Sequence, residues 1–289
     1  MVRVQFKMTY KYTLDRTSKK FNCPSCGKKT LVCYIEVETS KYLESTIGRC
    51  DRESKCAYHK SPNGNKIITS SVLQKIEEPS SHDDNVIGGY GRNYSNNNFV
   101  QYLRQYFCTT DIEGVIRKYF IGTSTYWKGA TIFWQVDHQM NVCAGKVMLY
   151  NGKNGKRVKK PRVFINWMHK VLQIDDFVLQ QCLFGIHNLC DYKKGDTICI
   201  VESEKTAIIM SLFYPSYLWL ATGSKTNLKL SVLKPLKDYK IIVYPDKSEY
   251  KSWNTKVEGF QKMGYTIICS DFLEDFKACE GTDLADVMI

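Results

Sequence analysis

The sequence has no long apolar run and no repeated unit. No stretch of 18 apolar residues occurs among its 289 residues, so we expect no membrane-spanning helix. The N-terminal stretch MVRVQFKMTYKYTLDR carries charges throughout and lacks the apolar centre of a signal peptide. There is no heptad run and no internal repeat either. These absences predict a cytoplasmic protein without a membrane partner.

Acidic residues are scarce relative to basic ones. The chain has 41 Lys and Arg against 29 Asp and Glu, which gives a formal net charge of +12. Such an excess favours a polyanionic partner, and nucleic acid is the first candidate. Hydrophobic residues make up 43% of the chain, an ordinary share for a globular protein that buries its own core.

Cysteine, in contrast, is plentiful, with 12 residues. In a reducing compartment these thiols are not expected to form disulfides. Seven of them are scattered among apolar neighbours, where cysteine acts as a small core residue. These seven are Cys108, Cys143, Cys182, Cys190, Cys199, Cys269 and Cys279.

The other five cysteines lie close together near the N-terminus. Cys23-x-x-Cys26 is followed by Gly27, a pattern typical of a zinc knuckle. Cys50 and Cys56 offer the second pair of thiolates, and His59, in Cys-x-x-His spacing, is an alternative fourth ligand. The interval between the halves leaves room for a β-hairpin. The segment therefore predicts a zinc ribbon, with structural Zn²⁺ needed for folding because so small a unit has little core. Cys33, in a strand-like run, is predicted to be a packing residue.

The chain reads as four parts. They are an N-terminal arm and zinc ribbon (1–62), a linker rich in Ser, Asn, Gly and Asp (63–97), a mixed basic region (98–190) and a C-terminal region (191–289). In the third part, helical spacing over 97–107 and 111–120 precedes two strand-like runs at 129–137 and 141–151. Asn98 is the expected N-cap of the first helix, and the two runs predict a hairpin or meander.

The C-terminal part alternates apolar strands with amphipathic helices. Strand-like segments at 196–202, 216–223, 239–246 and 265–271 are separated by three helical ones. This β-α repetition predicts a parallel sheet covered on both faces. The predicted fold class is α/β, α+β overall: a zinc ribbon, a mixed α+β middle region and a parallel β/α sheet.

Two acidic residues follow strands of this predicted sheet. Glu202 ends one buried strand and Asp246 ends another. Side chains at the carboxyl ends of parallel strands meet in one crevice, where carboxylate oxygens suit Mg²⁺. Gly223, after the intervening strand, allows close backbone approach. Alternatively, these acids cap helix N-termini and face water.

The same segments carry a resemblance to a known family. They are IVESEKTA, LATGSKT, VYPDKSEY and GTDLADVMI. They resemble the Toprim domain, the catalytic fold of bacterial DNA primases and topoisomerases. The resemblance implies that Glu202 is the family's catalytic Glu, that Gly223 is its Gly after the second strand and that Asp246 is the first Asp of its Asp-x-Asp. The region before the sheet is similar to the segment preceding a primase Toprim core, and the order of parts resembles a mobile-element-type family of bacterial primase-like proteins.

One position departs from the Toprim pattern. The second Asp of Asp-x-Asp falls on Ser248, whose hydroxyl is a weaker, neutral metal ligand. The loss of this ligand counts against catalysis. The fold prediction is unchanged, because it rests on the alternation of apolar strands and helices. Other acids are candidates for the missing ligand. They are Glu204, Glu249, Asp271, Asp283 and Asp286.

A basic run precedes the predicted sheet. Residues 146–170 hold eight Lys and Arg residues and no acid, with aromatic residues among them. Cations that hold phosphates beside rings that stack on bases suit a single strand. Alternatively, the run is a solvated basic loop. The candidate nucleic-acid-binding residues are Lys153, Lys156, Arg157, Lys159, Lys160 and Arg162.

Together these features predict a primase-like nucleotidyltransferase that makes RNA primers on single-stranded DNA. In this hypothesis Glu202 and Asp246 hold Mg²⁺ and an incoming nucleoside triphosphate, and a replicative helicase is a further partner. One alternative is a catalytically degenerate Toprim-like protein that binds nucleic acid, for which Ser248 is the motive. Another is a Toprim nuclease.

Overall fold

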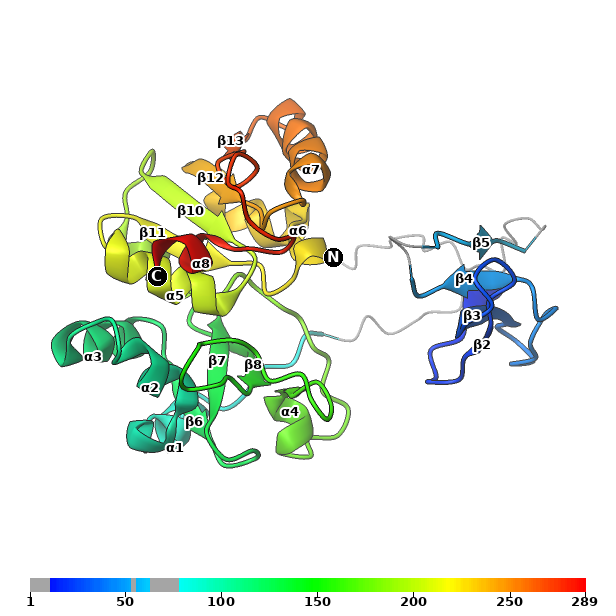
Figure 1. Ribbon diagram of the computed structural model, residues 1–289, viewed down its shortest axis with the longest axis horizontal. Coiled ribbons are helices and arrows are strands. Elements are labelled where there is room, and N and C mark those ends of the chain that lie inside the picture. Colours follow the sequence, from blue (N-terminus) through cyan, green and yellow to red (C-terminus); the bar gives the residue numbers. More distant parts are fainter. Residues whose placement is uncertain (1–10, 53–55, 63–77) are drawn as a thin grey trace, which may run out of the picture. The chain divides into compact units, whose positions relative to one another are not determined.

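The structure is a computed structural model that describes residues 11–52, 56–62 and 78–289 (Figure 1). The chain divides into two compact units, Met1–Ile76 and Glu77–Ile289. The start of the predicted N-terminal arm and most of the predicted linker, residues 63–77, lie outside the described residues. Within the part that the structure describes, no helix has both the length and the apolar character needed to cross a bilayer.

The first unit is a small antiparallel sheet built around one long strand. β3 pairs with β1, β2 and β4, and β4 pairs with β5. Leu31 and Cys33 on β3 pack with Cys23 and Cys50 in a core of only a few buried side chains. The strands are β1 (Tyr12–Leu14), β2 (Phe21–Asn22), β3 (Lys29–Glu36), β4 (Gly48–Cys50) and β5 (His59–Lys60).

The second unit contains a four-stranded antiparallel sheet in the order β6-β7-β8-β9. The predicted hairpin is confirmed, because β7 and β8 pair antiparallel around the turn after Val136. Every residue of β7 is buried, since the sheet packs on both faces. The strands are β6 (Gly122–Ser124), β7 (Ala130–Val136), β8 (Val142–Met148) and β9 (Ile165–Trp167).

The second sheet of this unit is parallel, as the alternation of strands and helices predicted. Its order is β11-β10-β12-β13, so the first strand in sequence lies inside the sheet. Ile200 pairs with Leu220 on one side and with Val243 on the other. The strands are β10 (Thr197–Val201), β11 (Leu218–Ala221), β12 (Lys240–Tyr244) and β13 (Thr266–Cys269).

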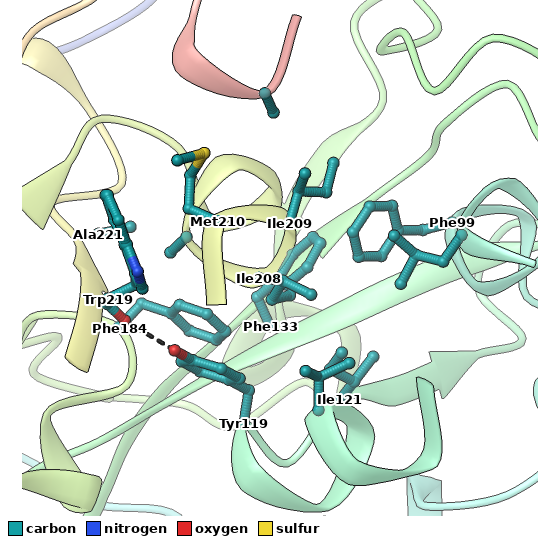
Figure 2. Packing of buried hydrophobic residues seen from close by; sticks show 14 of the residues in the cluster. Phe99, Tyr119, Ile121, Phe133, Phe184, Ile208, Ile209, Met210, Trp219 and Ala221 are labelled. Carbon is teal, nitrogen blue, oxygen red and sulfur yellow. Dashed lines mark hydrogen bonds between the residues drawn. The ribbon is translucent and has the colours of Figure 1, made fainter. Parts of the chain in front are cut away.

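Helices cover both faces of the parallel sheet. On one face α7 and the short helices α6 and η4 pack against Ile198, Ile241 and neighbouring strand residues. On the other face lies α5, whose residues Ile208 and Ile209 also meet Phe99 and Phe133, so that this helix joins the two sheets (Figure 2). The α-helices are α1 (Val86–Tyr90), α2 (Asn98–Leu103), α3 (Thr109–Lys118), α4 (Met168–Val171), α5 (Glu204–Phe213), α6 (Leu230–Leu233), α7 (Tyr250–Lys262) and α8 (Leu284–Met288). The 3-10 helices are η1 (Tyr94–Asn96), η2 (Ile186–Asp191), η3 (Lys225–Asn227) and η4 (Lys234–Leu236).

A buried tyrosine at the end of α3 links this helix to the parallel sheet. Tyr119 is fully buried, and its hydroxyl donates a hydrogen bond of 2.9 Å to the carbonyl oxygen of Trp219 on β11 (Figure 2). Its ring stacks on Phe184 at a centroid distance of 5.3 Å. A buried phenol needs such a partner, so the pair fixes α3 against the parallel sheet.

The N-cap of α2 is one residue earlier than its sequence suggests. Asn98 is the expected cap, but the side chain of Asn97 accepts hydrogen bonds from the backbone N–H groups of Phe99 and Val100. Asn97 is fully buried, accepts a third bond from Thr131 and donates to the carbonyl oxygen of Gly122. It therefore joins a helix start to two strands of the antiparallel sheet, a role that helical spacing alone does not indicate.

We expect Asn97→Ala to lower the free energy of unfolding by about 3 kcal/mol, because it removes a helix cap and leaves buried donors and acceptors unpaired. Asn98→Ala is the matched control and should cost only about 1 kcal/mol, since Asn98 Nδ2 makes a single bond to Tyr150 O, 2.8 Å long. Denaturant unfolding measures both values. Equal losses would contradict the assigned role of Asn97.

Candidate functional site

Four cysteine side chains converge in the first unit. The Sγ atoms of Cys23, Cys26, Cys50 and Cys56 all lie within 4.8 Å of one another. Gly27, at a φ of +67°, turns the chain back so that its N–H donates to Cys23 O at 2.8 Å. Four thiolates at this spacing form a closed tetrahedral set of the kind that structural zinc takes. Among the described residues no other group of His, Cys, Asp and Glu side chains converges in this way.

The four thiols do not share one electrostatic environment. Burial raises the pKa of Cys23 to about 11. A hydrogen bond from the backbone of Lys28 is the main cause that lowers the pKa of Cys26 to about 6. The pKa of Cys56 is also lowered, chiefly by its hydrogen bond with Ser25. Donors around the cluster thus stabilise negative charge on sulfur, which a metal-binding thiolate requires.

Two other residues near the cluster do not join it. His59, the alternative fourth ligand, lies with its Nε2 atom 2.9 Å from the hydroxyl of Tyr34. Cys33 is buried on β3, and its thiol lies 3.8 Å from the carbonyl oxygen of Ser45. The structure therefore places Cys50, and not His59, beside the other three sulfurs, and it places Cys33 in the ribbon's core.

In the second unit, Glu202 and Asp246 follow neighbouring strands of the parallel sheet at the same end. Val201 at the end of β10 pairs in register with Tyr244 at the end of β12. Burial raises the pKa of Asp246 to about 8, and the charge of Glu202 contributes to that shift. Burial and the charge of Glu249 raise the pKa of Glu202. The two carboxylates thus lie half-buried at the same edge of the sheet, and their charges repel each other, an arrangement that suits a hard divalent cation.

A lysine and two aspartates adjoin these carboxylates. Lys205, in the first turn of α5, lies 3.0 Å from Asp286 Oδ1 and 3.4 Å from Asp283 Oδ2. Both aspartates belong to the start of α8, where they form a capping box. Their charges raise the pKa of Asp246 further, and the charge of Lys205 lowers it. The four acids and this ammonium group therefore form one charged region, the crevice.

Backbone and polar groups fill the space beside Glu202. Gly223, at a φ of +76°, donates from its N–H to Glu202 O at 2.8 Å and accepts a bond of the same length from Lys146 Nζ. A β-carbon at this position would lie 3.0 Å from Glu204 Oε1, so a larger residue here would crowd that carboxylate. Gln135 is fully buried nearby and has no hydrogen-bond partner for its amide.

Lys146 belongs to the basic run of the sequence, and its ion-pair partner was not predicted. Its Nζ atom lies 3.0 and 3.2 Å from the two carboxylate oxygens of Glu204, and both side chains are buried. Glu204 is therefore occupied by an internal ion pair. Glu249 pairs with Lys225 at 3.0 Å. Lys146 and Glu204 are 58 positions apart in the sequence, so no local sequence pattern reveals this ion pair.

The other basic residues of the run lie on the surface. All six candidate nucleic-acid-binding residues are exposed and occupy the connection between β8 and β9, whereas Lys170 lies on α4. Among these six, Arg157 is near enough for its charge to lower the pKa of Glu202, against the larger effect of burial. Tyr150, an aromatic residue of the same run, is buried in the core and not available to stack on a base.

The chain matches two family models and several solved structures. The model described as Domain of unknown function (DUF6371) matches residues 97–247, and a zinc beta-ribbon finger model matches residues 10–69. No curated protein matches the sequence. The zinc-ribbon match and the cysteine cluster confirm the predicted ribbon fold of the N-terminal part.

The similar solved structures are primase cores. The primase fragment of the bacteriophage T7 primase-helicase protein is 14% identical, with 93% of each chain covered and a TM-score of 0.40. The RNA polymerase domain of Mycobacterium tuberculosis primase DnaG is 13% identical, with 70% of this chain and 75% of that chain covered and a TM-score of 0.45. The E. coli primase catalytic core is 10% identical, with 70% and 73% covered and a TM-score of 0.42.

We expect the purified chain to carry one zinc ion. Cys50→Ser should reduce the bound zinc to well under half an ion per chain, because three sulfurs leave the tetrahedron open. His59→Ala and Cys33→Ser are the controls and should keep the full ion, since neither side chain joins the cluster. Elemental analysis by mass spectrometry gives the count. Loss of zinc from His59→Ala, with retention in Cys50→Ser, would reverse the ligand assignment.

We expect Asp246→Asn to stabilise the protein without added Mg²⁺ or Mn²⁺. The pKa of Asp246 is raised from 3.8 to about 8, so stability from this group is complete below pH 3.8 and is lost as pH rises through about 8. Replacing the charge should raise the free energy of unfolding by about 2 kcal/mol at pH 9, with the gain shrinking toward pH 4. Denaturant titrations across this range measure it.

Asp275→Asn is the control for that series, because Asp275 is exposed and its substitution should change little at any pH. A gain from Asp246→Asn that is the same at pH 4 and pH 9 would show that Asp246 carries no charge repulsion.

Proposed function

The chain belongs to the family described as Domain of unknown function (DUF6371), and for this member we propose a primase-like nucleotidyltransferase activity that makes short RNA primers on single-stranded DNA. One observation carries the proposal. Two half-buried carboxylates, Glu202 and Asp246, follow adjacent parallel strands, and Arg157 of an exposed basic loop is near enough for its charge to lower the pKa of Glu202. An acidic crevice next to a cationic track fits a reaction between a metal-bound triphosphate and a polyanionic template.

In this proposal the parallel sheet is a Toprim-type catalytic unit. Glu202 and Asp246 would hold Mg²⁺, which when bound neutralises the phosphates and the charge that develops during nucleotide transfer. The raised pKa values of both residues support the assignment, because two under-compensated carboxylates gain from a shared cation. Gly223 would let the backbone approach the substrate at the end of β11.

The basic loop would hold the template. Its six exposed cations lie between β8 and β9, and Arg157 extends the positive charge toward Glu202. Cations along an exposed connection bind phosphates with little regard to sequence and with strong salt dependence. The zinc ribbon would provide a second contact to the nucleic acid. Nucleoside triphosphates are the predicted small-molecule substrates, and a replicative helicase stays a predicted partner.

One feature favours a second candidate, a nucleic-acid-binding protein without chemistry. Ser248 is exposed, has a φ of +77°, and its N–H donates to Glu274 Oε1 at 2.8 Å. A serine held this way offers no negative charge to a cation after Asp246. The two candidates share the fold and the basic loop, and they differ in whether nucleotides are joined.

We expect the full chain to incorporate labelled ribonucleotides on single-stranded DNA with Mg²⁺ or Mn²⁺. Glu202→Gln and Asp246→Asn should each reduce the rate by at least about 100-fold, because each removes a charged metal ligand. Glu258→Gln is the matched control, since Glu258 is exposed on α7, and its rate should stay within about twofold of the parent.

The outcomes separate the candidates. Template binding without incorporation under either metal would favour the binding protein. Nicking of supercoiled plasmid that depends on Glu202 would favour the nuclease. Incorporation that survives both crevice substitutions would place the chemistry elsewhere.

A further inference from the structure

Two neighbouring aromatic residues lie in the turn between β6 and β7. Tyr126 is 48% exposed, whereas Trp127 is half-buried and packs against the core of the antiparallel sheet. Their ring centroids are 4.8 Å apart, with the ring planes at 59° to each other. Tyr126 therefore presents its ring to solvent on a support that the core holds in place.

The chain just before β9 brings a third ring and a cation to the same place. Phe164 packs edge-to-face on Trp127, with the ring centroids 5.3 Å apart. The guanidinium group of Arg162 lies 5.6 Å from the centroid of the Phe164 ring, and Val163 between these two residues is 63% exposed. Tyr126, Trp127, Phe164 and Arg162 thus form one surface, the aromatic platform.

Backbone contacts hold the turn of the aromatic platform in place. The N–H of Ala130 donates to Trp127 O at 3.0 Å, and the N–H of Asn98 donates to Gly129 O at the same distance. Gly129 has a φ of +84°, and a β-carbon there would lie 2.2 Å from the side-chain oxygen of Asn98. The turn is therefore fixed against the start of α2, so that a ligand would not have to order it on binding.

The segments that carry the aromatic platform hold cations and no acids. Residues 118–136 and 138–174 contain no Asp or Glu. Lys128 and Lys160 are exposed near the platform residues in sequence. Positive charge beside exposed rings is complementary to a strand with unpaired bases, because the cations meet the phosphates and the rings stack on the bases.

The aromatic platform and the crevice are linked by β8. Lys146 of β8 donates to Gly223 O at 2.8 Å, next to Glu202. Three residues farther along the chain, the N–H of Leu149 donates to Phe164 O at 3.3 Å. Three residues of a strand span about 10 Å, so one nucleic-acid strand of a few nucleotides can reach both places.

We infer that the aromatic platform stacks on unpaired bases of the template strand, with Tyr126 as the ring on which a base lies. The inference rests on the proposed function, because it takes single-stranded DNA as the partner. Tyr150, an aromatic residue within the basic run, is buried and unable to stack, and Tyr126 lies outside that run in sequence. Stacking on a ring accepts any base, since every base has a π-face, so the platform adds affinity for unpaired strands without selecting a sequence.

The test measures the affinity of the full, zinc-loaded chain for labelled oligo(dT) by fluorescence anisotropy, without nucleotides. Tyr126→Ala should weaken binding about 10-fold, because it removes a ring on which a base stacks. Tyr126→Phe keeps the ring and should stay within about twofold of the parent. Tyr217→Ala is the matched control, since Tyr217 is 40% exposed just before β11, and it should also stay within about twofold.

Two further measurements separate stacking from charge. A strand of abasic sites keeps the phosphates and lacks the bases, so Tyr126→Ala and the parent should bind it equally. Tyr126→Ala should also leave the salt dependence of oligo(dT) binding unchanged. Arg162→Gln, in contrast, should reduce the slope of log Kd against log salt concentration by about 0.7, because it removes one cation that meets a phosphate.

Equal binding of oligo(dT) by the parent and by folded Tyr126→Ala would overturn the inference and leave the proposed function standing. An equal loss on the abasic strand would overturn it as well, because Tyr126 would then act without bases. If the parent binds no single strand, the template contact of the proposed function fails together with the inference. Should Tyr126→Ala not fold, Tyr126→Leu replaces it, and this variant should lose at least about fivefold in affinity for oligo(dT).

Discussion

The arrangement of the second unit depends on the buried ion pair between Lys146 and Glu204. Lys146 rises from the antiparallel sheet, and Glu204 opens the helix that covers the parallel sheet, so the pair joins the two layers at the crevice. Burying both charges is costly, but once they are buried the loss of one partner typically costs about 3–5 kcal/mol. Lys146 also holds the carbonyl oxygen of Gly223, which fixes the backbone at the end of β11 beside Glu202.

The first turn of α5 therefore provides a helix cap and two ion pairs. Ser203 caps the helix by accepting from the N–H of Thr206, Glu204 pairs with the antiparallel sheet, and Lys205 pairs with α8. Glu202 lies between the end of β10 and this turn, and both of these segments are fixed by packing and ion pairs. A site at a fixed helix start and at the ends of two central strands keeps its geometry better than a site on loops.

The fold was largely predictable from the sequence, and the site only in part. Apolar alternation and cysteine spacing are local signals, so they indicated the parallel sheet, the hairpin and the four-cysteine group, and the ends of parallel strands brought Glu202 and Asp246 to one edge. Local sequence patterns do not reveal the ion-pair partners of the buried lysines, because these partners are distant in sequence: Lys205 and Asp286 are 81 positions apart. Asn97 and Tyr150 show the same limit: whether a polar or aromatic residue faces the core depends on packing between distant segments.

The position of α8 has a consequence for how the chain matures during synthesis. Asp283 and Asp286 follow every strand of the parallel sheet in sequence, yet they are the groups that neutralise Lys205. A ribosome-bound intermediate could pair all four parallel strands while this lysine still lacked its counter-ions. Docking of the red helix α8 onto α5 (Figure 1) would then follow the pairing of these strands, so that folding of the sheet and neutralisation of Lys205 would be separate events in time.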